Sequence, residues 1–221
     1  MAHHHAPTKE AVTIAGPAGA LEALLEVPDR SQFSRVAVIC HPHPLHHGSM
    51  LNKVVHTMAR AMLDLGYPAL RFNFRGVGAS EGQFAEGVGE TEDAQAVCAW
   101  GRERYGDAGL VLAGFSFGAM VACRAALAVR PEWLITVAPP VARTQKLLDG
   151  QRPPGPWLIV QGDADGVVPA HEVAQWAEEL GSAAELVMLS GVDHFFHGRL
   201  TMLRQTLVGR LATSRPAGAS A

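Results

Sequence analysis

The pentapeptide Gly-Phe-Ser-Phe-Gly at positions 114–118 constrains the fold more than any other stretch of this chain. It follows the apolar run Leu110–Ala113, which has the length and composition of a buried strand, and it precedes Ala119–Arg130, which has the composition of a helix. A serine between them would lie on a sharp turn, and the glycines on either side would leave room for neighbouring backbone. The sequence therefore predicts a strand-turn-helix unit that presents the hydroxyl of Ser116 to solvent.

Strands and helices alternate along the rest of the chain. Continuous apolar runs such as Val36–Cys40 are typical of strands that are covered on both faces, and Asn52–Leu65 places its apolar residues on one helical stripe. Before them, Glu10–Ile14 and Leu21–Val27 predict an antiparallel pair at a sheet edge. Further strands are predicted at 67–74, 133–138, 157–161 and 185–189, and further helices at 91–105, 170–180 and from residue 200. This order predicts an α/β fold with a mostly parallel central sheet and helices on both faces.

Length and charge narrow the possible functions. The 221 residues fit a single domain, predicted at 9–215, with flexible termini at 1–8 and 216–221. A net charge of −3 without a basic stripe argues against nucleic acid or an anionic membrane as partner, and no apolar run is long enough to span a bilayer. The three cysteines lie in apolar contexts typical of reduced, buried thiols, which favours a cytoplasmic location. The tract His3–His5 is too short to indicate a metal site.

The segments directly after the predicted strands carry most of the reactive side chains. In an open parallel sheet these segments meet at the carboxyl edge, where ligands bind. They include Ser116, an acidic pair at Asp163 and Asp165, and His194. A serine needs a base to become a nucleophile, the base needs a third group to fix its tautomer, and the attacked carbonyl needs donors for its developing charge. The chain supplies these groups on separate loops, so nucleophilic acyl transfer is the predicted chemistry.

From about residue 11 to residue 211 the sequence resembles small bacterial serine hydrolases of the α/β-hydrolase superfamily that lack a lid, in which the loop after the third strand reads His-Pro-x-Pro, here 41–44. The resemblance implies an α/β-hydrolase fold with Ser116, Asp165 and His194 as the catalytic triad, because the acid lies in a G-x-x-D-x-x-V-P segment and the histidine in a D-H-F-F segment. It also implies oxyanion donors from the backbone N–H of Phe117 and from the third-strand loop. His43 is our choice for the second donor, and Leu45 is the alternative.

Other residues could take these roles. Asp163 could be the acid in place of Asp165, which would then be a turn residue. Asp193 is next to His194 and could be argued as its partner, although a turn role is favoured. His197 could replace His194 as base, but imidazole at the start of a helix can simply cap or pack.

Two more features have two interpretations each, and a third has one. The histidines at 41, 43, 46 and 47 could bind a metal, but their spacing matches no known ligand set, and prolines between them suit a rigid loop that aims an N–H. Arg75 could contact a substrate carboxylate or could pin loops together. Ser80 is interpreted as a turn serine.

The expected reaction is hydrolysis of small or short-acyl carboxylic esters without a metal or other cofactor. Only one short helix, Val141–Leu148, fits between the strands at 133–138 and 157–161, so no large lid can cover the site. Thioester or amide hydrolysis and acyl transfer are alternatives on the same residues, as is a non-catalytic binding protein with this fold. The substrate-binding residues are not assigned by the sequence, and a homodimer is possible.

Overall fold

A computed structural model describes residues 7–30 and 32–213, and these form one eight-stranded sheet flanked by helices. The strands are β1 Thr8–Gly16, β2 Gly19–Val27, β3 Arg35–Cys40, β4 Ala69–Phe72, β5 Gly109–Phe115, β6 Trp133–Val137, β7 Trp157–Gly162 and β8 Ala184–Leu189. The helices are α1 Lys53–Asp64, α2 Val88–Tyr105, α3 Phe117–Val129, α4 Val141–Leu148, α5 Ala170–Leu180 and α6 Leu200–Thr213, with short 3₁₀ turns η1 Pro44–His46 and η2 Gly181–Ala183.

The strand order is β1-β2-β4-β3-β5-β6-β7-β8, and all pairs from β4 to β8 are parallel. Strands β1 and β2 form the predicted antiparallel hairpin at one edge, and β2 also runs antiparallel to β4. The α/β-hydrolase fold predicted from the sequence is therefore correct. Strand β1 pairs Thr8 with Val27, so regular structure begins one residue before the predicted domain boundary; residues 1–6 and 216–221 lie outside the described residues.

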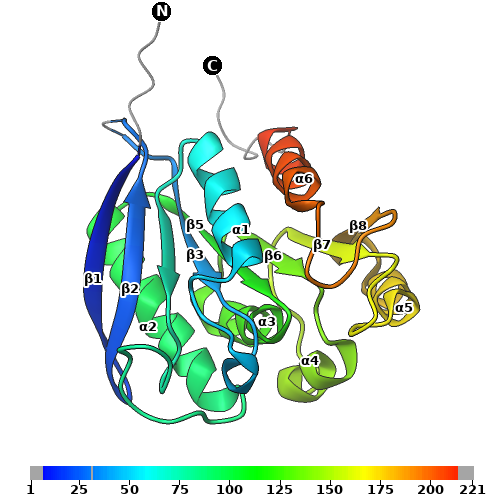
Figure 1. Cartoon of the computed structure of the whole chain (residues 1–221), viewed down its shortest axis with the longest axis horizontal. Helices are drawn as coiled ribbons and strands as arrows, with labels where there is room; N and C mark the ends of the chain where they lie inside the picture. Colours follow the sequence, from blue (N-terminus) through cyan, green and yellow to red (C-terminus); the bar gives the residue numbers. More distant parts are fainter. Residues whose placement is uncertain (1–6, 31, 214–221) are drawn as a thin grey trace, which may run out of the picture.

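Helices cover both faces of the sheet (Figure 1). Helices α1 and α6 contact each other on the face toward the viewer, and α2, α3, α4 and α5 lie on the other side. Each face has its own buried apolar cluster, because alternate residues of β3 point in opposite directions: Val36 and Val38 face α2 and α3, whereas Ala37 and Ile39 face α1. The strands buried on both sides explain the continuous apolar runs of the sequence.

Several predicted elements have different bounds in the structure, and two of the differences have a clear physical cause. Strand β4 is shorter than the predicted 67–74, because Pro68 has no N–H to donate and the N–H of Phe74 donates to the ring of His41 instead of to the sheet. Helix α2 begins at Val88 and not at 91, because the Glu90 carboxylate accepts hydrogen bonds from the N–H groups of Ala85 and Gly87 and so caps the first turn.

The strand register brings the candidate loops to the same level. Cys40 of β3 lies opposite Gly114 of β5, and Gly162 of β7 lies opposite Leu189 of β8. The chain also reverses its direction of travel across the sheet at β3, which has β4 on one side and β5 on the other. Such a switch point is where open α/β sheets bind ligands.

Between β6 and β7 the chain forms only α4 and a proline-rich link, so no lid covers the carboxyl edge of the sheet. Within the two described ranges, no helix is long and apolar enough to cross a membrane.

Candidate active site

Ser116 lies at the junction of β5 and α3 with a backbone conformation that is rare for a residue with a side chain. Its φ is 55° and its ψ is −118°, and the surrounding backbone holds it there through a hydrogen bond from its N–H to the carbonyl of Val137. A Cβ on Gly114 would collide with the carbonyl of Gly118, and a Cβ on Gly118 would collide with the carbonyls of Cys40 and His41. The two glycines are therefore required by close backbone approach, as the motif predicts.

Ser116, His194 and Asp165 form a chain of contacts. Nε2 of His194 lies 3.2 Å from Oγ of Ser116, and Nδ1 lies 2.8 Å from Oδ2 of Asp165. The His194 and Asp165 side chains are only 6% and 1% exposed, and the ring of Phe115 packs against the imidazole. The structure thus brings together three residues that are 78 and 29 positions apart in the sequence.

Hydrogen bonds fix the carboxylate of Asp165 on both of its oxygens. Oδ1 accepts from the N–H groups of Val167 and Val168, and Oδ2 accepts from the side-chain amide of the buried Gln161 as well as facing His194. Burial raises the pKa of Asp165, but the hydrogen bonds from His194, Val168 and Val167 outweigh burial, so the net pKa lies below its ordinary value. Asp165 is consequently ionised at neutral pH and can orient the imidazole.

The alternative acids and the alternative base have other partners. The Asp163 carboxylate accepts a hydrogen bond from the N–H of Gly191 and so ties the loop after β8 to the loop after β7. Asp193 accepts from the N–H groups of Phe195 and His197, and it pairs with the exposed ring of His197. The structure therefore gives Asp193 the favoured turn role and places none of these three side chains in contact with Ser116.

The two candidate oxyanion donors have free N–H groups. No hydrogen bond within residues 7–30 and 32–213 occupies the N–H of His43 or of Phe117, which begins α3 and so has no acceptor in its own helix. The N–H of Leu45, in contrast, donates to Nδ1 of His43. This contact favours His43 over Leu45 as the second donor.

The histidines of the loop after β3 do not share one site. His41 is fully buried; its Nδ1–H donates to the carbonyl of Pro42, and its Nε2 accepts from the N–H of Phe74. His43 and His46 are in ring contact, and His47 is exposed. Across the described part of the chain, no group of three or more His, Cys, Asp or Glu residues has an arrangement that could hold a metal ion.

Because His41 is buried, the fold is expected to lose stability in mild acid. Burial lowers the pKa of His41 from 6.5 to about 4, although its bond to Pro42 opposes the shift. Between these two values the unfolded chain binds a proton that the folded chain does not, so stability falls as pH decreases from 6.5 toward 4. We expect urea unfolding to show that, between pH 7 and pH 4.5, the free energy of unfolding falls by about 2–3 kcal/mol more in the wild-type protein than in a His41→Gln variant. An equal loss in both proteins would contradict this role of His41, and His197→Gln, which changes an exposed ring, is the matched control.

Arg75 and Ser80 hold loop segments in place. The Arg75 guanidinium is buried and forms ion pairs with Asp93 and Glu92 of α2, so it pins the loop after β4 as in the second interpretation. Ser80 ends a turn, and its hydroxyl accepts from Glu22 N–H and donates to the carbonyl of Asn73.

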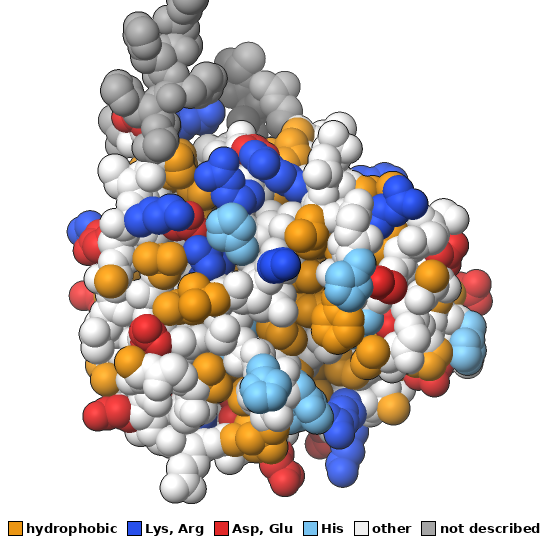
Figure 2. Space-filling view, viewed as in Figure 1, with side chains coloured by type: hydrophobic (Ala, Val, Ile, Leu, Met, Phe, Trp, Pro, Cys, Tyr) orange, Lys and Arg blue, Asp and Glu red, His pale blue; other side chains and the backbone are white. Residues whose placement is uncertain are grey.

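A cavity of about 620 Å³, which the sequence did not predict, is lined by His43 and by Phe117, the residue that follows Ser116. It is lined by apolar side chains together with charged ones at its mouth: His43, Leu45, His46, Phe84, Glu86, Val88, Phe117, Met120, Arg143, Lys146 and Leu147. The rings of His43, Phe84 and Phe117 contact one another at centroid distances of 4.8 to 5.8 Å. Hydrophobic and histidine side chains lie next to one another on the face shown in Figure 2.

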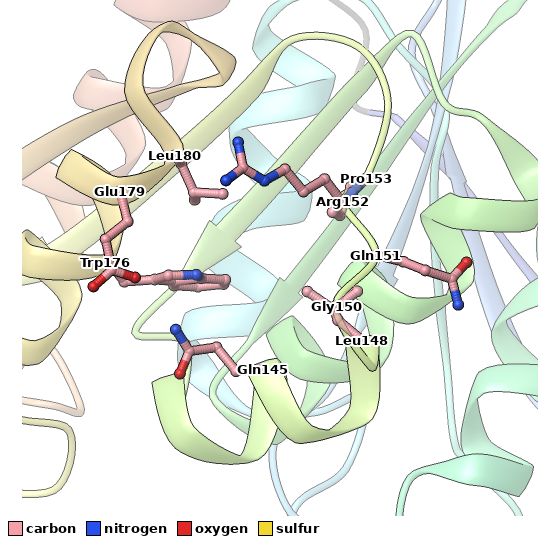
Figure 3. A pocket seen from close by; sticks show the side chains of 9 residues that line it. All are labelled: Gln145, Leu148, Gly150, Gln151, Arg152, Pro153, Trp176, Glu179 and Leu180. Carbon is pink, nitrogen blue, oxygen red and sulfur yellow. The ribbon is translucent and has the colours of Figure 1, made fainter.

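A second hollow, of about 250 Å³, lies between α4, the link at 150–153 and α5 (Figure 3). Its walls include Leu148 from α4 and Trp176 from α5. It shares no lining residue with the larger cavity, and neither of the proposed oxyanion donors, His43 and Phe117, lines it.

Gln161 and the cavity were missed because their signals are not local. The sequence places Gln161 as the last residue of an apolar strand. Only its contact with Asp165 shows that it helps to hold that carboxylate. The cavity combines the loop after β3, the segment 84–88 and α4, which no sequence spacing relates to one another.

The fold, the strained serine and its histidine and carboxylate neighbours define a class of protein: the chain belongs to the α/β serine hydrolases without a lid. Residues 20–155 match the profile of the X-Pro dipeptidyl-peptidase (S15) family. The matched segment includes Ser116 but ends before Asp165 and His194. The comparisons thus confirm the family predicted from the sequence.

Three relatives illustrate the match. A lidless α/β serine hydrolase from Xanthomonas campestris is 43% identical, with a TM-score of 0.85 over 94% of this chain and 97% of that chain. An α/β serine hydrolase homologue from Coxiella burnetii is 46% identical, with a TM-score of 0.86 over 91% of this chain and 97% of that chain. An uncharacterized protein of Rickettsia prowazekii is 38% identical over 82% of this chain and 79% of its own length.

Proposed function

We propose that Ser116, His194 and Asp165 form a catalytic triad that hydrolyses small or short-acyl carboxylic esters. The observation that carries the proposal is the chain of contacts from Oγ of Ser116 to Nε2 of His194, and from Nδ1 of His194 to Oδ2 of Asp165. The carboxylate holds the proton of the neutral imidazole on Nδ1, so Nε2 is free to accept the proton of the serine.

The reaction follows from these positions. Oγ of Ser116 attacks the ester carbonyl carbon while its proton moves to Nε2 of His194, and the N–H groups of His43 and Phe117 stabilise the oxyanion. The ester C–O bond then breaks, and the proton on His194 goes to the leaving alcohol. Water then attacks the acyl carbon while its proton moves to Nε2 of His194. The bond between the acyl carbon and Oγ breaks, the proton on His194 returns to Oγ of Ser116, and the carboxylic acid leaves.

Two features support esters as substrates. The site is open because the chain between β6 and β7 forms no lid, and the adjoining cavity has an apolar interior that suits a short acyl group. Peptide hydrolysis is the second candidate, since the profile that matches residues 20–155 is that of X-Pro dipeptidyl-peptidases. Thioesterase and acyltransferase activities and a non-catalytic binding role fit the same framework less directly.

A fluorophosphonate probe followed by a substrate panel tests the proposal. The probe is expected to label the protein but not its Ser116→Ala variant. The panel consists of 4-nitrophenyl esters of increasing acyl length, the matching thioesters, and Xaa-Pro 4-nitroanilides. Short-acyl esters are expected to give the highest kcat/KM. Higher kcat/KM for the Xaa-Pro anilides would establish the peptidase alternative, and a strong preference for long-chain esters would contradict an open, short-acyl site.

The oxyanion role of His43 can be tested by comparing two variants that lack its ring and differ in whether they keep its backbone N–H. His43 has φ −55°, which is close to the value that proline requires, so His43→Pro is compatible with the loop but lacks the donor. His43→Ala removes the same ring and keeps the N–H, which makes it the matched control. We expect kcat of His43→Pro to be about 10²- to 10³-fold below that of His43→Ala. Equal kcat in the two variants would exclude His43 as a donor.

A further inference from the structure

The larger cavity lies on the acyl side of the proposed reaction. His43 and Phe117, whose N–H groups are the proposed oxyanion donors, both contribute to its lining, whereas His194 does not. The leaving alcohol must depart next to His194, because the imidazole gives it a proton. The lining by His43 and Phe117 therefore favours this cavity as the space for the acyl group of the substrate.

The interior of this cavity is apolar and partly aromatic. Phe84, Phe117, Met120 and Leu147 form walls from three separate parts of the chain, and Leu45 at the mouth is 67% exposed. Val88 is also exposed, at 62%, and an apolar cavity with exposed apolar side chains is suited to methylene groups of a substrate. An acyl chain of several carbons fits this lining.

The mouth of the cavity carries an excess of positive charge. Arg143 and Lys146 are three positions apart on α4, so they lie on the same face of that helix, and both line the cavity. Both are exposed, and neither forms an ion pair with another residue of the ranges 7–30 and 32–213. Glu86 is the one acidic side chain of the lining.

Arg143 acts on the cavity electrostatically. Burial is the largest cause of a lowered pKa for His43, and the neighbouring His46 and the positive charge of Arg143 lower it further. Arg143 is thus close enough to His43, whose N–H adjoins the reaction, for its charge to reach the acyl side of the site.

We propose that the preferred substrates are esters whose apolar acyl chain ends in a carboxylate, which Arg143 and Lys146 bind at the mouth of the cavity. This inference rests on the proposed function and deepens it. The reaction remains hydrolysis: the ester C–O bond breaks, the oxygen of water bonds to the acyl carbon, and a dicarboxylate and an alcohol are released.

Two chromogenic esters of equal length distinguish the effect of the terminal carboxylate on kcat/KM from the effect of the apolar acyl chain. One is the mono-4-nitrophenyl ester of adipic acid, and the other is the same ester with its free carboxylate replaced by a primary amide. We expect kcat/KM to be about tenfold higher for the carboxylate, the effect of two exposed ion pairs. The ratio is expected to fall to about one in Arg143→Gln/Lys146→Gln, to fall in about 0.5 M NaCl, and to rise in Glu86→Gln.

Arg104→Gln is the matched control for the loss of one positive charge. Arg104 lies near the far end of α2, about 24 Å along the helix from Val88 at the cavity, and its one described ion pair is with exposed Glu10. It is expected to keep the wild-type ratio, and an equal fall in this variant would overturn the assignment to α4.

The outcomes distinguish the inference from the function on which it rests. Hydrolysis of the carboxylate and the amide with equal kcat/KM would overturn the inference and leave the esterase proposal intact. A tenfold ratio that persists in Arg143→Gln/Lys146→Gln would also overturn it. Absence of hydrolysis of both esters, together with absence of fluorophosphonate labelling, would overturn the proposed function and the inference with it.

Discussion

Replacing Ser116 by alanine is expected to lower kcat for 4-nitrophenyl esters by about 10⁴-fold or more. The variant loses the Oγ that lies 3.2 Å from Nε2 of His194, and no acyl-enzyme can form without it. The residual rate is expected to reflect only substrate binding and the N–H groups of His43 and Phe117, which polarise the carbonyl toward water. Steady-state kinetics with active-site titration of the wild-type enzyme measures the difference.

The fold is expected to tolerate this substitution. Alanine takes the same backbone position as serine at φ 55°, and the side chain of Ser116 caps no helix. Thermal unfolding therefore checks that activity is lost without loss of structure. Ser80→Ala is a poor control because its hydroxyl forms one buried and one partly buried hydrogen bond. Ser49→Ala, in contrast, removes a local contact with the N–H of Leu51. Turnover of Ser116→Ala near the wild-type value would refute the assignment of the nucleophile.

Much of the fold follows from the sequence because its strands are buried on both faces. A run such as Val36–Cys40 has no polar position, and a helix with an apolar stripe cannot satisfy that pattern. The elbow was predictable for a related reason: the glycines at 114 and 118 are required by backbone contacts that any Cβ would prevent. Both signals are local, and both are steric or hydrophobic.

The features of the site that the sequence did not predict depend on contacts between distant segments. The sequence groups four histidines in one loop, but only the fold shows that His41 turns inward to accept the N–H of Phe74 while His43 turns toward Phe117. Gln161 bonds to Asp165 only because the chain turns back after β7. Tertiary hydrogen bonds of this kind leave no periodicity in the sequence, so a residue type and its position cannot reveal them.

Ser116 and the loop that carries His43 are both held in fixed positions, which favours the proposed chemistry. Ser116 adopts an unfavourable backbone conformation, and hydrogen bonds and close packing from β3, β6 and α3 hold it there. The ring of His43 packs against that of Phe117 at the start of α3. A site held in this way needs little reorganisation during the reaction, which is the condition under which oxyanion donors are effective.

The choice between the two neighbouring acids gives the sharpest test of the proposed triad. In Asp165→Asn, the side-chain oxygen is expected to keep the hydrogen bonds from the N–H groups of Val167 and Val168, which turns the amide NH₂ toward His194. His194 must then accept on Nδ1 and carry its proton on Nε2. This tautomer cannot take the proton of Ser116, so kcat is expected to fall by about 10³- to 10⁴-fold.

Asp163→Asn is the matched control, because it removes the same charge two residues away. The carboxylate of Asp163 bonds only to the N–H of Gly191 among the described residues, and the oxygen of asparagine can accept that bond. Its kcat is therefore expected to stay within about threefold of the wild-type value. If Asp163→Asn lost activity and Asp165→Asn kept it, Asp163 would be the acid. Circular dichroism of both variants ensures that the comparison is made between folded proteins, so the difference in kcat reports the orientation of His194.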